Sequence, residues 1–137
     1  STLMRSSAAS DVYKRQPYRF IKQKLIDISE DDSEFERRAE ITIEAHGEVT
    51  TLTGYGNGPI DAVKNALNSL PEMHSHLLDY SEHALTSGSS SKAAAYVYLR
   101  AKGSARQEYG VGIHPNITTA TVKAIISGMN RLYKTLK

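Results

Sequence analysis

Two glycine-rich segments carry the residue types of a binding site for a small anion. Gly54-Tyr-Gly-Asn-Gly-Pro59 leads directly into one predicted helix, and Gly110 to Asn116 leads into another. Glycine lets a backbone approach a ligand closely, and the free N–H groups of a helix start attract negative charge. Neither segment contains lysine or arginine, and no Lys-Ser or Lys-Thr pair follows the first at phosphate-loop spacing. These features favour a small carboxylate as the ligand, and a simple turn is the alternative for either segment alone.

Histidine, serine and acidic residues between these segments could in principle support metal binding or catalysis. His74-Ser-His76 places two imidazoles on one face of a predicted strand, and Ser81 precedes Glu82 and His83. No acidic ligand completes a metal set, and the serine has no nucleophile-elbow or triad context. We therefore predict no metal site and no catalytic residue, and we assign the histidines to the surface or to packing. Asp79 remains notable, because burying the polar side chains of this strand costs free energy unless they bind a partner or face solvent.

The hydrophobic pattern predicts the elements that position these residues. Alternation of apolar and polar residues indicates strands, and apolar residues three or four apart indicate helices. The predicted strands are 18–28, 38–46 and 49–53, then 77–85, 93–101 and 107–113, and the predicted helices are 59–70 and one ending near residue 136. An acidic connector at 29–36 and a polar loop at 86–92 separate neighbouring strands. The order βββα therefore occurs twice.

Local sequence supports an internal repeat. Gly54-x-Gly56 precedes the first helix as Gly110-x-Gly112 precedes the second, and Ala62-Val-Lys-Asn-Ala66 resembles Thr121-Val-Lys-Ala-Ile125. A three-stranded sheet with one helix leaves a face uncovered, which packing the two units together would bury. We predict an α+β fold, a pseudo-twofold pair of βββα units with antiparallel sheets and one helix each. The units are 17–72 and 73–137.

Composition restricts the classes of function. Residues 1–16 have no clean period and are interpreted as a foreign leader of vector or read-through origin. Without their three basic residues and one acidic residue, the rest has 14 basic and 14 acidic residues, so it lacks the positive charge typical of nucleic-acid binding. No apolar run approaches the roughly 20 residues needed to span a membrane. The absence of cysteine fits a cytoplasmic location.

Four segments resemble the C-terminal regulatory domain of 2-isopropylmalate synthase, and most closely the actinobacterial and fungal subgroup. They are Gly56-Asn-Gly-Pro-Ile60, Asp79-Tyr-Ser-Glu-His-Ala84, Ala93-Ala-Ala-Tyr96 and Gly110-Val-Gly-Ile-His-Pro-Asn-Ile-Thr-Thr-Ala120. The resemblance covers about residues 18 to 136. It implies a domain that dimerises and binds leucine, the feedback inhibitor of an enzyme that condenses acetyl-CoA with 2-oxoisovalerate. The catalytic barrel and its divalent metal would lie outside this chain, which should itself have no synthase activity and need no cofactor.

The resemblance and the residue chemistry together give a set of expected leucine contacts. We expect the carboxylate near one glycine segment, the ammonium at Asp79, and the side chain in a slot walled by Tyr80 and Ala84. The full set is Gly56, Asn57, Gly58, Ile60, Asp79, Tyr80, Ala84, Asn116, Ile117 and Thr118. Aspartate at Gly56 or Gly58 is then expected to block leucine while leaving the fold largely intact. The alternatives are an isoleucine-binding regulatory domain of citramalate synthase, a nucleic-acid-binding module and a stand-alone enzyme.

Overall fold

The structure, a computed structural model, describes residues 16–28, 37–85 and 91–136, with side chains to residue 133. The predicted leader up to residue 15, the acidic connector 29–36 and residues 86–90 of the polar loop lie outside the described residues. The elements are β1 (Tyr18–Asp27), β2 (Arg37–Ala45), β3 (Glu48–Gly56), α2 (Pro59–Asn68), the 3₁₀ turn η1 (Pro71–Met73), β4 (Ser75–Ala84), β5 (Ala93–Ala101), β6 (Gln107–His114) and α3 (Ile117–Leu136). The predicted α+β fold, with the order βββα occurring twice, is confirmed.

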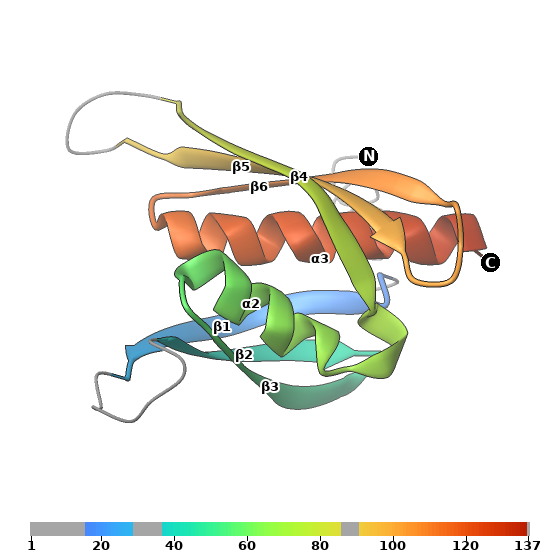
Figure 1. Cartoon of the computed structure of the whole chain (residues 1–137), viewed down its shortest axis with the longest axis horizontal. Helices are drawn as coiled ribbons and strands as arrows, with labels where there is room; N and C mark the ends of the chain where they lie inside the picture. Colours follow the sequence, from blue (N-terminus) through green and yellow to red (C-terminus); the bar gives the residue numbers. More distant parts are fainter. Residues whose placement is uncertain (1–15, 29–36, 86–90, 137) are drawn as a thin grey trace, which may run out of the picture.

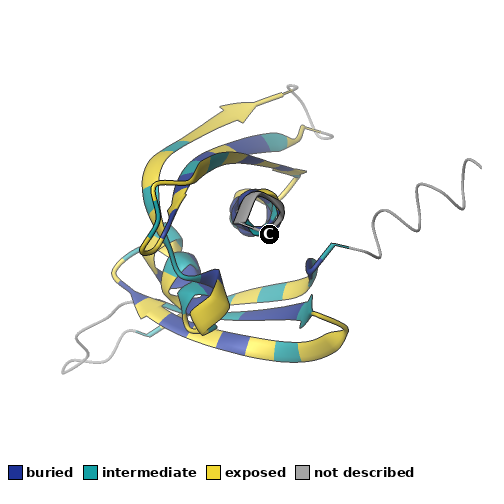
Figure 2. Ribbon diagram, turned by 90° about the vertical axis from the view of Figure 1, so that its right-hand side faces the viewer, coloured by how far each residue is buried: buried dark blue, intermediate teal, exposed yellow. Residues whose placement is uncertain are grey.

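Each unit forms its own three-stranded antiparallel sheet, with strand order β1-β2-β3 in the first and β4-β5-β6 in the second. Helix α2 packs on β2 and β3, whereas α3 packs on β5 and β6 and also contacts β1 of the first unit. Figure 1 shows α3 running between the two sheets, and Figure 2, which looks along α3, shows them on either side of it. The second helix is thus the central element that joins the units.

The core follows from the predicted periodicities. Ala39, Ile41 and Ile43 share one face of β2 and are fully buried, as are Val63 and Leu67 on the inner stripe of α2. These apolar side chains contribute roughly 1.5–3 kcal/mol each when fully buried, apart from the smaller alanine. Much of this core therefore lies within the first unit, where α2 packs on β2 and β3.

One buried polar side chain ties α3 to the first strand. The Asn130 amide accepts a hydrogen bond from the Tyr18 backbone N–H (3.0 Å) and donates one to the Tyr18 carbonyl (2.9 Å). Asn130 is buried, and both its amide oxygen and its amide nitrogen have a hydrogen-bond partner. These bonds offset the free-energy cost of burying the polar amide. This pair fixes the position of α3 relative to β1.

Neither Gly-x-Gly pair lies in a turn: the prediction was wrong for Gly54 and Gly56, which follow the predicted strand 49–53, whereas the predicted strand 107–113 contains the second pair. Gly54 and Gly56 lie inside β3, and Gly110 and Gly112 lie inside β6. A Cβ on Gly54 would lie 2.0 Å from the Ala66 backbone nitrogen. A Cβ on Gly110 would lie 2.0 Å from the carbonyl oxygen of Ala124. The glycines therefore let each helix pack directly on the strand that precedes it, a role that any side chain would prevent.

The same geometry corrects the expectation for aspartate at Gly56. A Cβ there would lie 2.6 Å from the Ala62 backbone nitrogen, so a side chain must displace α2 and cannot leave the fold intact. Gly58 differs, because a Cβ would meet nothing within 4 Å.

Over the described ranges, no helix is long and apolar enough to cross a membrane.

Candidate ligand-binding site

A pocket of about 290 Å³ lies where the two helices begin, at the junction of the two units. The first unit provides Pro59, Ile60 and Val63 from α2. The second unit provides Tyr80 and Glu82 from β4 and Ile117, Thr118 and Thr121 from α3. The pocket thus has apolar walls from both helices and a few hydroxyl and carboxyl groups, a composition typical of small-molecule sites.

The two helix starts differ in their free hydrogen-bond donors. The N-cap of α2 is Gly58, so no side chain caps this end. The N–H groups of Ile60 and Asp61 precede the first helical hydrogen bond and lack acceptors within the helix. At α3, by contrast, the Asn116 side chain accepts a hydrogen bond from the Thr119 N–H at 3.0 Å. The start of α2 is therefore the better place for a negatively charged group.

A hydroxyl network forms the polar side of the pocket. The Tyr80 hydroxyl lies 2.8 Å from Glu82 Oε2 and 3.0 Å from Thr121 Oγ1. The Thr121 hydroxyl donates to the Ile117 carbonyl at 2.9 Å. Burial raises the pKa of Tyr80; the hydrogen bond with Thr121 opposes this rise and Glu82 adds to it. The tyrosine is therefore neutral and has one proton to donate at neutral pH.

This network has more contacts than protons. With Glu82 ionised, the Tyr80 and Thr121 hydroxyls supply two protons for three oxygen–oxygen contacts. When Tyr80 donates to Glu82 and Thr121 donates to the Ile117 carbonyl, the contact between the two hydroxyls has no proton. When a ligand ammonium donates to Glu82, the Tyr80 hydroxyl is free to turn and donate its hydrogen bond to Thr121 Oγ1 instead. The network thus accommodates a cationic donor.

The structure brings four of the ten predicted contact residues together. Ile60, Tyr80, Ile117 and Thr118 line the pocket. Gly56, Asn57 and Gly58 precede α2, and Asn116 caps α3, so these four lie next to the pocket residues in the chain without lining the pocket.

The other two predicted residues do not line the pocket. Asp79 is exposed and accepts a hydrogen bond from the neighbouring Tyr80 N–H, and Ala84 is exposed at the end of β4. Successive side chains of a strand alternate between its faces, so Tyr80 and Glu82 share a face that Asp79 does not. That alternation was the available signal for Glu82, which the expected set of contacts did not include. Val63 and Thr121 follow by helical periodicity, one turn beyond Pro59 and Ile117.

The histidines do not gather into a metal site in the described part of the chain. No group of three or more His, Cys, Asp or Glu residues there is placed to hold a metal ion. His83 packs edge-on against Tyr96, with ring centroids 5.7 Å apart. His74 and His76 lie at the start of β4, away from the pocket at the helix starts.

Fold and pocket together define a class: an α+β domain of two similar βββα units with a pocket at their junction. Residues 5–133 match the family described as the LeuA allosteric (dimerisation) domain, and the chain belongs to this family. The match begins inside residues 1–16, the segment interpreted from its sequence as a foreign leader.

Several curated 2-isopropylmalate synthases are similar to the chain. The protein from Clostridium acetobutylicum is 44% identical over 92 residues, covering 67% of this chain and 16% of that protein. The protein from Mycobacterium leprae is 40% identical over 116 residues (85% and 18%), and that from Thermobifida fusca is 44% identical over 101 residues (74% and 17%). The chain therefore spans less than a fifth of the length of these relatives.

Proposed function

We propose that this chain is the effector-binding domain of a 2-isopropylmalate synthase and that its effector is leucine. The observation that carries the proposal is the pocket of about 290 Å³ at the helix starts, because residues from both units line it. A ligand there contacts α2 of one unit and α3 and β4 of the other. Its binding therefore favours one relative arrangement of the units, which is the requirement for feedback regulation.

Each part of leucine has a complementary group in this pocket. The isobutyl group packs against the aliphatic side chains of Ile60, Val63 and Ile117. The ammonium binds Glu82, which replaces Asp79 in this role because Glu82 lines the pocket and Asp79 does not. The carboxylate lies at the uncapped start of α2, where the helix dipole favours negative charge.

Calorimetric titration of the chain with leucine, isoleucine and valine tests the proposal. Leucine should bind most tightly, and the Glu82→Gln variant should bind it roughly 10-fold more weakly or worse, because a charge-assisted hydrogen bond is lost. Asp79→Asn is the matched control: it removes a carboxylate on the same strand, but outside the pocket, and should bind leucine as the parent does. Tighter binding of isoleucine would instead support the citramalate synthase alternative, and the absence of binding to all three would refute the function.

We also propose that the domain forms homodimers. The family description includes dimerisation, and the β4-β5-β6 sheet exposes large apolar side chains. Tyr109 is 62% and Ile113 49% exposed on β6, and Tyr96 is 42% exposed on the adjacent β5. Exposed apolar patches of this kind commonly mark association surfaces. Sedimentation equilibrium at tens of micromolar should therefore give twice the chain mass, and a single species of the chain mass would contradict the proposal.

A further inference from the structure

A second, polar pocket lies at the other seam between the units, away from the candidate effector site. It has a volume of about 340 Å³, and its walls come from α2 and from the start of β4, with Lys102 from the turn after β5. Its lining includes two lysines, Lys64 and Lys102, and two histidines, His74 and His76. No aspartate or glutamate is among its lining residues.

Within its lining, this pocket has two lysines and no carboxylate. Lys64 lies 4.0 Å from the exposed Asp61 carboxylate one helical turn away, a weak surface pair that leaves the ammonium available. The Lys102 Nζ lies 3.5 Å from His74 Nδ1, and no carboxylate of the described residues lies within ion-pair distance of it. Glu72, whose Oε1 lies 3.3 Å from His46 Nε2, lines a neighbouring pocket together with His74 and Lys102.

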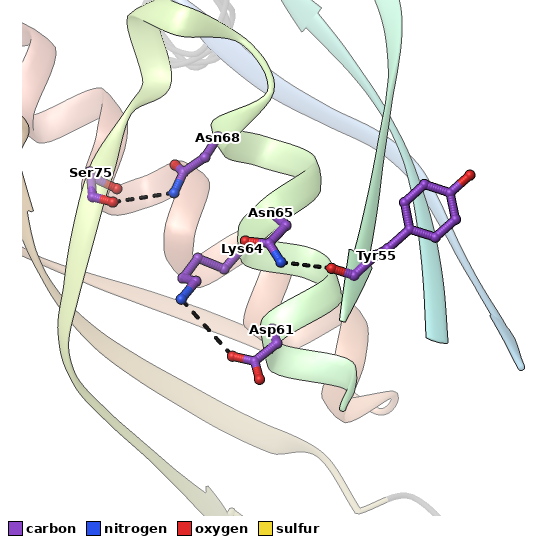
Figure 3. A network of polar contacts seen from close by, with 6 residues as sticks. All are labelled: Tyr55, Asp61, Lys64, Asn65, Asn68 and Ser75. Carbon is purple, nitrogen blue, oxygen red and sulfur yellow. Dashed lines mark hydrogen bonds and ion pairs between the residues drawn. The ribbon is translucent and has the colours of Figure 1, made fainter. Parts of the chain in front are cut away.

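Two asparagines add neutral donors in a fixed orientation. Asn65 donates one amide N–H to the Tyr55 carbonyl at 2.6 Å, and Asn68 donates one to the Ser75 carbonyl at 3.2 Å. Figure 3 shows Asn68 reaching from α2 to Ser75 of β4, whereas Asn65 turns toward Tyr55 of β3, away from the Lys64 ammonium. Each amide has a second N–H that these bonds do not use. The lining therefore combines lysines from both units with the oriented Asn68 amide of α2.

We propose that this pocket, lined by Lys64, Asn65, Asn68, His74, His76 and Lys102, binds the phosphate group of a small molecule. Several N–H donors from both units, in a lining without a carboxylate, match the many acceptor oxygens of a phosphate better than those of a single carboxylate. This assigns His74-Ser-His76 to anion binding, whereas an imidazole pair bound to metal would need further ligands. Because the pocket shares no lining residue with the candidate effector site, the inference does not depend on leucine binding.

Titration with inorganic phosphate and with pyrophosphate, followed by ¹H–¹⁵N NMR at constant ionic strength, tests the proposal. Saturable shifts are expected at the amides of Asn68, Ser75 and Lys102, with pyrophosphate binding more tightly. Lys64→Met and Lys102→Met should each weaken pyrophosphate roughly 10-fold, the size expected for one lost charge-assisted hydrogen bond. Both substitutions keep an apolar stem at a surface position, so the fold should persist.

Lys92→Met is the matched control, because Lys92 is exposed just before β5, at the opposite end of that strand from Lys102. It should leave pyrophosphate affinity unchanged, and Lys102→Met should leave leucine affinity unchanged. Equal loss in Lys92→Met and Lys102→Met, or equal shifts with sodium chloride alone, would overturn the proposal. Sedimentation with vesicles containing phosphatidic acid forms a second arm: Lys64- and Lys102-dependent binding there assigns a lipid phosphate, and binding of pyrophosphate alone assigns a free phosphate compound.

Discussion

Gly110→Ala should destabilise the domain by about 3 kcal/mol or more, the upper end of the cost of overpacking. The added Cβ would lie 2.0 Å from the Ala124 carbonyl oxygen and 2.5 Å from the Gly128 backbone nitrogen. Both are backbone atoms of α3, so no side chain can rotate away and the helix itself must shift. Because α3 packs between the two sheets, its displacement should disturb both units. Urea unfolding followed by circular dichroism measures the change.

Gly58→Ser is the control for this experiment. Gly58 also precedes a helix, but a Cβ there meets nothing within 4 Å, and serine is a favoured N-cap residue. This variant should be at least as stable as the parent. If Gly110→Ala unfolds at the same urea concentration as the parent, the close packing of α3 on β6 is wrong.

Ile60→Phe and Ile117→Phe should each remove leucine binding, although they lie in different units. Both side chains line the pocket of about 290 Å³ and neither is fully buried, so a larger side chain can enter the pocket without overpacking the core. A phenylalanine that fills the pocket excludes the isobutyl group of leucine, so the complex loses the free energy of burying it, about 1.5–3 kcal/mol. This loss corresponds to a roughly 10- to 150-fold weaker affinity. Calorimetry measures the affinity, and thermal melts report stability.

The matched control is Ile21→Phe. Ile21 is 46% exposed on β1 and does not line the pocket, so this variant should bind leucine normally. Loss of binding in Ile60→Phe alone, with normal affinity in Ile117→Phe, would contradict a pocket shared by both units. Normal affinity in both variants would remove the site from this pocket altogether.

Much of the fold could be predicted because its signals are local. The alternation of Ala39, Ile41 and Ile43 predicts a strand with one buried face, and Pro59 suits the first turn of a helix because its missing N–H needs no partner there. The lining of the pocket was only half predictable. Ile60, Tyr80, Ile117 and Thr118 lie within motifs of the family, whereas the assignment of Asp79 ignored the alternation that places Glu82 in the pocket.

The sequence by itself determined the order of the elements, the two-unit architecture and the family, because these depend on periodicity and on motifs along the chain. Only the tertiary structure decided what the glycines do. A glycine before a helix looks the same in sequence whether it faces a ligand or a neighbouring backbone, and Gly54 and Gly110 face helices. The location of the pocket was likewise a tertiary property. It depends on how α3 lies across both sheets, and that packing is set by contacts between residues far apart in the chain, such as Asn130 with Tyr18.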